Sequence, residues 1–359
     1  MTMDGALAGV KVVEMAGLGP GPFCAMLLAD HGAQVLRVVR PGSVSRPSDV
    51  MARGRPSLTL DLREPQSVAT VLALLDTADI LIEGYRPGVM ERLGLGPEVC
   101  LARRPRLIYG RITGWGQHGP LSQAAGHDLN YLALSGALWA VGDADRPPPP
   151  PLNLIGDFGG GGMLLAFGVV SGLLAARVSG VGQVVDAAMT DGSALLSAMV
   201  HGMLADGRWA NQREANLLDG GAPFYRCYRC ADDKYVSIAA IEPMFYAELL
   251  NRCGLHELRP EEQYDRAQWP ALKARLKALF RSRSRDAWCE LLAGTDACFA
   301  PVLDWQEALQ HPHNRARGTF VETDGITQPQ AAPRMSRTPG LARPVEHLSA
   351  QEALAAWHG

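Results

Sequence analysis

The first forty residues alternate between apolar runs and turns at the spacing of a strand–helix–strand unit. "VKVVEM" (10–15) has the short apolar run of a buried parallel strand, and "GLGPGP" (17–22) is a glycine-rich turn. "FCAMLLADHG" (23–32) has the pattern of a helix that ends at a glycine, and "QVLRVVR" (34–40) is a second apolar strand. This order predicts a βαβ unit.

The alternation continues with a predicted helix over 67–78 and predicted strands over 79–85 and 106–116. The N-terminal region is therefore expected to be α/β, with a Rossmann-like, doubly wound parallel sheet. Five consecutive prolines in "DRPPPPPLN" (145–153) cannot continue a helix or a central strand. They predict a stiff, extended connector.

After this connector the pattern predicts a long apolar helix over 163–180, a strand over 182–189 and a helix over 191–207. The next residues are more polar and rich in turn formers, and a compact α+β pattern follows them. We expect a large domain over 1–207, a linker over 208–222, a small α+β domain over 223–305, and a return of 306–359 to the large domain.

The composition narrows the class of ligand. The chain has 359 residues, 47% of them hydrophobic and 20% charged, as in soluble globular proteins. A formal net charge of -3 does not favour nucleic acid or an anionic membrane as partner. We expect no membrane span and no secretory signal. Seven scattered cysteines predict reduced thiols and a cytoplasmic protein, and "CYRC" (227–230) is more often ordinary than a zinc or redox site.

The first glycine cluster does not fit a dinucleotide fingerprint, because Pro22 stands where GxGxxG has its third glycine. Arg37 and Arg40 end the second predicted strand, where an NAD site has an acid. Arginine suits a phosphate on the ribose, as in coenzyme A. More arginines follow in turns; each taken singly fits surface charge, but together they favour an anionic nucleotide: Arg53, Arg55, Arg86 and Arg92.

Three ionisable residues stand among small or apolar neighbours: His127 in "AAGHDLNY", Asp157 in "LIGDFGGGG" and Glu242 in "AAIEPMF". An apolar setting disfavours the charged form of a carboxyl group and brings it toward acid–base work near neutral pH. Each residue alone is more often structural. The four glycines after Asp157 predict that something comes close to the backbone there.

Seven segments resemble the family III CoA-transferases, and within that superfamily they are most similar to the alpha-methylacyl-CoA racemases. The resemblance extends from about residue 7 to residue 340. Its segments are 16–41, 79–98, "RITGWGQHGP" (111–120), "AGHDLNYLALSG" (125–136), "PPLNLIGDFGGGGM" (150–163), "GQVVDAAMTDG" (182–192) and "AAIEPMFY" (239–246).

The resemblance implies an epimerisation of 2-methylacyl-CoA thioesters. In transferases the aspartate that matches Asp157 is a nucleophile. Racemases keep it and add a histidine in "GHD", matched by His127, and a glutamate in "EP", matched by Glu242. Leu132 stands where transferases have glutamine. This implies a two-base 1,1-proton transfer through an enolate, with His127 acting on the (S)-epimer and Asp157 on the (R)-epimer.

The resemblance also implies the supporting groups. Glu242 would hydrogen-bond His127, in an interlocked homodimer, and a helix starting near Gly162 would face the enolate. Gly159 and Gly160 would let the thioester lie against the backbone. CoA is part of the substrate, and no metal or separate cofactor is expected. The remaining CoA contacts would come from Arg40, Gly84, Tyr85, Arg92 and Asp128.

Two other functions stay open at this point. One is a CoA-transferase that uses Asp157 as nucleophile, and the other is an acyl-CoA-binding protein without turnover. The acyl group is also open, since Met199, Met203 and Met244 would suit any apolar chain.

Overall fold

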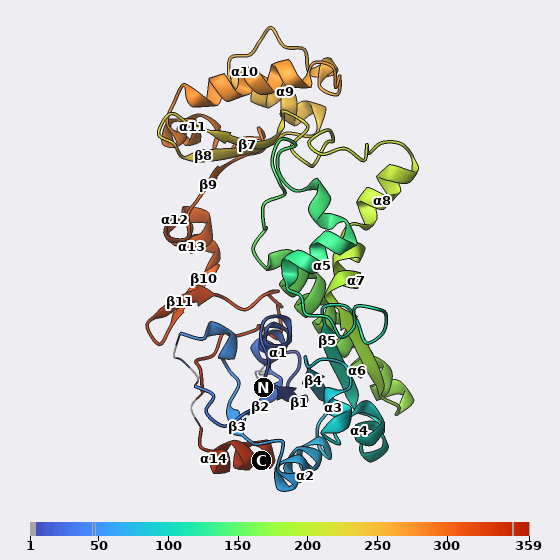
Figure 1. Cartoon of the computed structure of the whole chain (residues 1–359). Helices are drawn as coiled ribbons and strands as arrows, with labels where there is room; N and C mark the ends of the chain where they lie inside the picture. Colours follow the sequence, from blue (N-terminus) through green and yellow to red (C-terminus); the bar gives the residue numbers. More distant parts are fainter. Residues whose placement is uncertain (1–4, 45, 47, 347, 359) are drawn as a thin grey trace. The chain divides into compact units, whose positions relative to one another are not determined.

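The computed structural model describes residues 5–358 except 45, 47 and 347. The chain forms two compact units (Figure 1). Unit 1 contains Met1–Ala137, Pro150–Ser197 and Arg315–Gly359, and unit 2 contains Leu138–Pro149 and Ala198–Asn314.

Unit 1 is built on a six-stranded parallel sheet with the order β3-β2-β1-β4-β5-β6. The chain adds strands on one side of β1 and then on the other, so the order reverses between β1 and β4. This confirms the predicted Rossmann-like sheet. The strands are β1 (Lys11–Met15), β2 (Gln34–Val39), β3 (Ser57–Thr59), β4 (Ile80–Glu83), β5 (Ile108–Thr113) and β6 (Gln183–Ala188).

Helices cover both faces of this sheet. On one face α1 (Pro20–Asp30) and α6 (Leu164–Ser179) share an apolar core with the strands, in which Leu28 and Val169 are buried. On the other face, α2 (Pro65–Leu75), α4 (Pro97–Arg103) and α14 (Ala350–His358) bury Leu74 and Trp357. The Trp357 Nε1–H donates to Thr77 Oγ1 at 3.0 Å, so the last helix is fixed to unit 1.

The glycine-rich segment is itself helical. Residues Leu154–Met163 form the π-helix η3, which continues directly into α6. The expected helix start near Gly162 is therefore wrong, because the glycines lie inside a helix. By length and composition alone, the continuous stretch Leu154–Ser179 is long and apolar enough to cross a membrane. This is weak evidence for a span, since α6 contacts β5 and β6 as a core helix does.

The predicted helix 191–207 is two helices, α7 (Met189–Leu196) and α8 (Ala198–Ala205). Between them, the Ser197 hydroxyl donates to the Ser193 carbonyl at 3.3 Å. Serine side chains compete in this way with the backbone bonds of a helix. The short helices of unit 1 are α3 (Val89–Arg92), α5 (Asp128–Ser135) and η1 (Val50–Ala52), and its β10 (Phe320–Thr323) and β11 (Ile326–Pro329) form a hairpin.

Unit 2 packs helices against an antiparallel sheet of order β7-β8-β9. Its core is aromatic, with Phe224, Phe280 and Trp288 buried. Its elements are η2 (Ala137–Ala140, which begins in unit 1), α8, β7 (Tyr225–Arg229), β8 (Tyr235–Ala239), α9 (Pro243–Arg252), η4 (Pro260–Glu262), α10 (Trp269–Arg281), α11 (Arg285–Leu292), β9 (Phe299–Val302), α12 (Trp305–Gln310) and the start of α13 (Pro312–Arg317).

The division into units differs from the sequence-based boundaries. The segment 208–222, expected as a linker, is part of unit 2. The Asn216 side chain there is fully buried and donates to the carbonyls of Ala210 and Gln212 at 3.0 Å. Buried amides of this kind order a polar segment that composition alone marks as a loop. The return to unit 1 begins at Arg315 instead of 306.

Candidate active site

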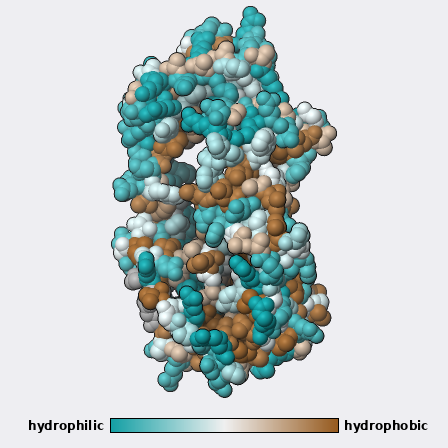
Figure 2. All heavy atoms as spheres, in the orientation of Figure 1, coloured by the Kyte–Doolittle hydropathy of each residue, from teal (hydrophilic) through white to brown (hydrophobic). Residues whose placement is uncertain are grey.

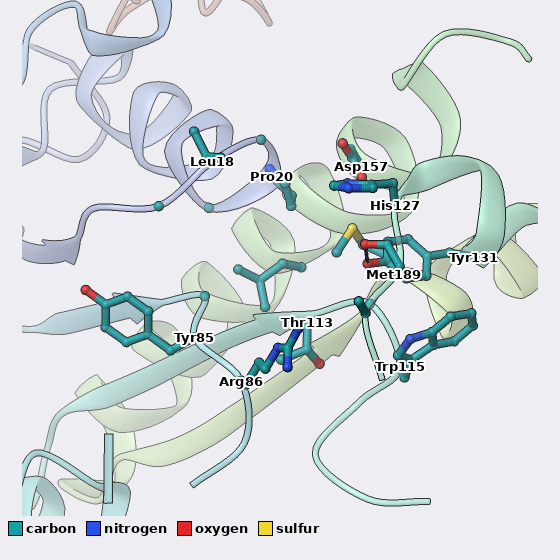
Figure 3. Close-up of a pocket in the computed structure, with 18 of the residues that line it drawn as sticks. Leu18, Pro20, Tyr85, Arg86, Thr113, Trp115, His127, Tyr131, Asp157 and Met189 are labelled. Carbon is teal, nitrogen blue, oxygen red and sulfur yellow. Dashed lines mark hydrogen bonds between the residues drawn. The ribbon is translucent and has the colours of Figure 1, made fainter. Parts of the chain in front are cut away.

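A cavity of about 440 Å³ lies in unit 1 at the carboxyl ends of β1, β4 and β5. This is where the strand order reverses, the place at which open α/β sheets bind ligands. Its walls come from the segments that follow these strands: 17–22 after β1, 84–87 after β4 and 113–115 after β5. Figure 3 shows Tyr85 and Arg86 across the cavity from His127 and Asp157.

The structure places His127 and Asp157 on the wall of this one cavity, as the two-base hypothesis requires (Figure 3). His127 is the N-cap of α5, where its backbone N–H donates to the Asn130 side chain at 3.0 Å. Asp157 lies in the first turn of η3 and is partly buried. Asn153 Nδ2 donates to Asp157 Oδ2 at 3.4 Å.

The surroundings of Asp157 raise the pKa of its carboxyl group above the ordinary value. Burial is the main cause, and the negative charge of Asp128 acts in the same direction. The Asn153 hydrogen bond and the proximity of His127 oppose the pKa shift. The result is a carboxyl group that is more readily protonated than an ordinary aspartate, which suits proton transfer in both directions.

Gly19, the N-cap of α1, adjoins Asp157. It has a φ of 69°, and a β-carbon there would lie 3.3 Å from Asp157 Oδ2. Glycine is required on both counts, because a side chain at this position would be strained and would crowd the carboxylate. Pro20 and Pro22 follow it and carry no N–H. Among residues 20–22, only Gly21 has a backbone donor in the first turn of α1.

The four glycines after Asp157 serve helix packing more than ligand approach. A β-carbon at Gly160 would lie 2.8 Å from the Ser193 nitrogen in α7, and one at Gly192 would lie 1.9 Å from the Gly160 carbonyl oxygen. Gly159 and Gly160 are not among the residues that line the cavity. The close approach that the glycines predict is thus made by a neighbouring helix, which corrects the expected contact with a thioester.

Two of the residues expected to contact CoA, Gly84 and Tyr85, line the cavity. The Tyr85 N–H donates to Glu83 Oε2 at 2.7 Å, and the same glutamate accepts from Arg111 Nε at 2.6 Å, so this loop is tied to the sheet. Burial and the negative charge of Glu83 raise the pKa of Tyr85, and the positive charge of Arg40 opposes that rise.

Arg40 and Arg92 are exposed to solvent and are not among the lining residues of the cavity. Arg40 directly follows β2, and Arg92 ends α3. Arg86, in contrast, lines the cavity. The sequence offers it only as one of several arginines in turns, with no signal that separates it from the others.

Arg53 and Arg55 are wrong as candidate phosphate ligands, because both are buried and paired. Arg53 Nε donates to Asp30 Oδ1 at 2.9 Å and Nη1 donates to the Pro329 carbonyl at 2.7 Å. Arg55 forms an ion pair with Glu14, whose side chain is fully buried. Their positive charges are neutralised by carboxylates inside the protein, so they are not available to bind a phosphate.

Asp128 was expected to contact CoA, but its side chain is 4% exposed and is not among the cavity-lining residues. Its Oδ1 atom accepts the backbone N–H of Asp157 at 2.6 Å. Leu132, one helical turn further along α5, is also buried. The "GHD" motif therefore presents its histidine to the cavity and its aspartate to the interior.

Glu242 is the exposed N-cap of α9 and belongs to unit 2. Its pairing with His127 therefore stays a prediction. Met199 and Met244 are exposed in the same unit. Within the described residues no group of three or more His, Cys, Asp or Glu side chains is placed to hold a metal ion. Cys227 and Cys230 are free thiols, the second one buried.

The apolar wall of the cavity was not predicted. Trp115 and Tyr131 lie edge to face with their ring centroids 4.8 Å apart, and Ile112 and Met189 complete this wall. A β-carbon at Gly114 would overlap the Tyr131 ring, so glycine is needed there. The sequence gives no signal for this wall, because its members come from three separate elements.

Fold and cavity define an open-sheet α/β protein with a cavity at the carboxyl edge of the sheet and an aspartate and a histidine on the cavity wall. The chain belongs to CoA-transferase family III, whose model matches residues 7–346.

Relatives of known name agree with this assignment. The chain is 48% identical to the alpha-methylacyl-CoA racemase of Mus musculus, with 93% of this chain and 88% of that protein covered. It is 44% identical to the alpha-methylacyl-CoA racemase of Homo sapiens, with 94% and 88% covered. The structure resembles the crystal structure of a CAIB/BAIF family protein from Brucella suis at a TM-score of 0.82 and 26% identity, over 98% of both chains.

Proposed function

We propose that the protein is a 2-methylacyl-CoA racemase that inverts the α-carbon of (R)- and (S)-2-methylacyl-CoA thioesters. The observation that carries this proposal is that His127 and Asp157, far apart in the sequence, line one cavity. The names of the mouse and human relatives support the same reaction.

In the proposed reaction one of the two groups removes the α-proton, and the electron pair of the C–H bond moves into the thioester to give an enolate. The other group delivers its proton to the opposite face of the α-carbon. His127 takes the proton of the (S)-epimer and Asp157 that of the (R)-epimer. The raised pKa of Asp157 favours its role as proton donor after the enolate has formed.

The enolate oxygen needs hydrogen-bond donors in fixed positions. The first N–H groups of a helix have no partner within the helix, and α5 begins at Asp128 beside His127. We place the enolate oxygen at this helix end instead of at Gly162, because the glycines lie inside η3. The dipole of α5 favours negative charge at the same point.

The nucleotide part of CoA is proposed to lie over the loop after β4, with Gly84 and Tyr85 below it and Arg40 and Arg92 at its phosphates. These arginines are exposed, and guanidinium groups pair well with phosphate. CoA enters as part of the substrate, without a separate cofactor. Trp115, Tyr131 and Met189 offer an apolar wall for the acyl group.

We further propose a cytoplasmic homodimer in which Glu242 of one copy hydrogen-bonds His127 of the other. Exposed apolar side chains support a partner surface. Phe167 is 71% exposed and Val178 91% exposed on α6. Apolar residues are also exposed on α8 (Figure 2), where Met199 is 56% exposed. A dimer mass by sedimentation supports this proposal, and a monomer at micromolar concentration contradicts it.

The test of the activity uses one epimer of a 2-methylacyl-CoA in D₂O without any acceptor acid. Racemisation with deuterium at the α-carbon is the expected result. The variants His127→Ala and Asp157→Ala should each lose about 10²–10⁴-fold in rate.

The second candidate, a CoA-transferase, is favoured by the family itself and by the accessible carboxyl of Asp157. It predicts no exchange without an acceptor, and CoA transfer with a covalent adduct on Asp157 when an acceptor acid is added. That outcome would replace the racemase proposal.

A further inference from the structure

We infer that Asp128 is a positioning residue whose buried carboxylate holds Asp157 at a fixed place relative to His127. This inference rests on the proposed function. The first observation is a hydrogen bond of 2.6 Å from the Asp157 N–H to Asp128 Oδ1. Since Asp128 follows His127 directly at the start of α5, the bond joins the helix of one base to the helix of the other.

The surroundings of this bond are shaped to admit the carboxylate. A β-carbon at Gly156 would lie 2.7 Å from Asp128 Oδ1, so glycine precedes Asp157 for a steric reason. The Asp128 side chain is 4% exposed, and among the described residues its Oδ2 atom has no hydrogen-bond partner. Burying a carboxylate with one oxygen unpaired costs free energy, so the fold gains no evident stability from Asp128, and this favours a role in positioning Asp157.

The charge of Asp128 also acts on Asp157, because a negative neighbour opposes ionisation. The other groups that face the Asp157 carboxyl are His127, whose charge favours ionisation, and Asn153, which donates to it. Tyr131 of α5 also interacts with its charge. The residues of α1 and α7 that lie closest to the glycines of η3 are all uncharged: Pro20, Phe23, Met189, Gly192, Ser193 and Leu196. Asp128 is thus the acidic neighbour of Asp157.

Two substitutions separate the hydrogen bond from the charge. Asp128→Ala removes both, and Asp128→Asn keeps an oxygen acceptor while removing the charge. With Asp128→Ala we expect kcat to fall by about 10-fold to 10²-fold with KM changed by less than about threefold, because small displacements of a catalytic group have effects of this size. Asp128→Asn should keep kcat within about tenfold of the wild type.

Asp128→Asn should move the acid limb of the kcat/KM profile to lower pH, because Asp157 loses a negative neighbour. The ¹³C NMR titration of the Asp157 carboxyl carbon, assigned with Asp157→Asn, measures the same pKa without turnover. The expected shift is toward the ordinary value of an aspartate. A role in folding alone would not move this pKa.

Gly156→Ala is the matched variant, because it keeps Asp128 and crowds its Oδ1 atom. It should lower kcat as Asp128→Ala does, in protein whose circular dichroism shows it folded. An unchanged kcat in Asp128→Ala, or a rise in KM alone, would overturn the inference; the second result would make Asp128 a CoA ligand. Absence of racemisation in the wild type would overturn the proposed function instead. The NMR titration would then still test whether Asp128 acts on the pKa of Asp157, because it needs no turnover.

Discussion

Two sets of arginines in unit 1 look alike in the sequence and differ in the structure. Arg53 and Arg55 follow β2 in a turn, and both are buried against carboxylates. Arg40, Arg86 and Arg92 also stand in turns or at the ends of elements, but they face solvent. The comparison shows that a guanidinium buried against a carboxylate is already paired inside the fold and costly to remove, whereas an exposed guanidinium is accessible to an anion.

The largest effect is a loss in the free energy of unfolding, and it is expected where a buried ion pair is broken. Arg55→Ala removes the nearer cation of the fully buried Glu14 carboxylate and leaves Arg37, whose Nε atom lies 3.8 Å from Glu14 Oε2. Removing one partner of a buried pair destabilises by about 3–5 kcal/mol. Urea denaturation should show this loss as a lower midpoint or as failure to fold. A denaturation midpoint equal to that of the wild type would contradict this prediction, because Arg55 would then contribute no more to stability than the exposed arginines do.

The next effect is on substrate binding. Arg40→Ala and Arg92→Ala should each raise KM by about 10-fold to 10²-fold, because a hydrogen bond to a charged group contributes about 1.5–3 kcal/mol. Steady-state kinetics with a 2-methylacyl-CoA measures this rise. The thermal midpoint should not change, since both side chains are exposed. A variant with a lower thermal midpoint and an unchanged KM would contradict the comparison, because its arginine would then contribute to stability and not to substrate binding.

A smaller effect is expected at Asp157 itself. Its pKa is raised in the folded protein, so the charged form opposes folding at neutral pH. Asp157→Asn should therefore stabilise the protein at pH 7, by less than about 1 kcal/mol because solvent screens a partly exposed group. This gain should fade as the pH falls through the folded pKa and then through the ordinary aspartate range. Thermal midpoints between pH 4 and pH 8 test this, and a gain that grows toward low pH would contradict the pKa direction.

The smallest effect is expected at Arg63, which is exposed and paired with Asp61 at 2.6 Å, outside the cavity. Arg63→Ala should leave both KM and the denaturation midpoint unchanged, because exposed ion pairs contribute little. It is the control for the two preceding arginine variants. A rise in KM for this variant would show that Arg63 also contributes to CoA binding, so that the anion-binding surface extends beyond the loop after β4.

The local sequence pattern determined five of the six strands of the parallel sheet, because such a strand is an apolar run that needs no distant partner to be recognised, and it missed the short β3. It also indicated His127 and Asp157, each marked by small or apolar neighbours, and the family resemblance added Tyr85. Tertiary structure decided the partners: which arginines meet carboxylates, that the glycines after Asp157 pack against α7, and that Asp128 holds Asp157. These contacts join residues distant in the chain, and their existence depends on how helices pack on the sheet.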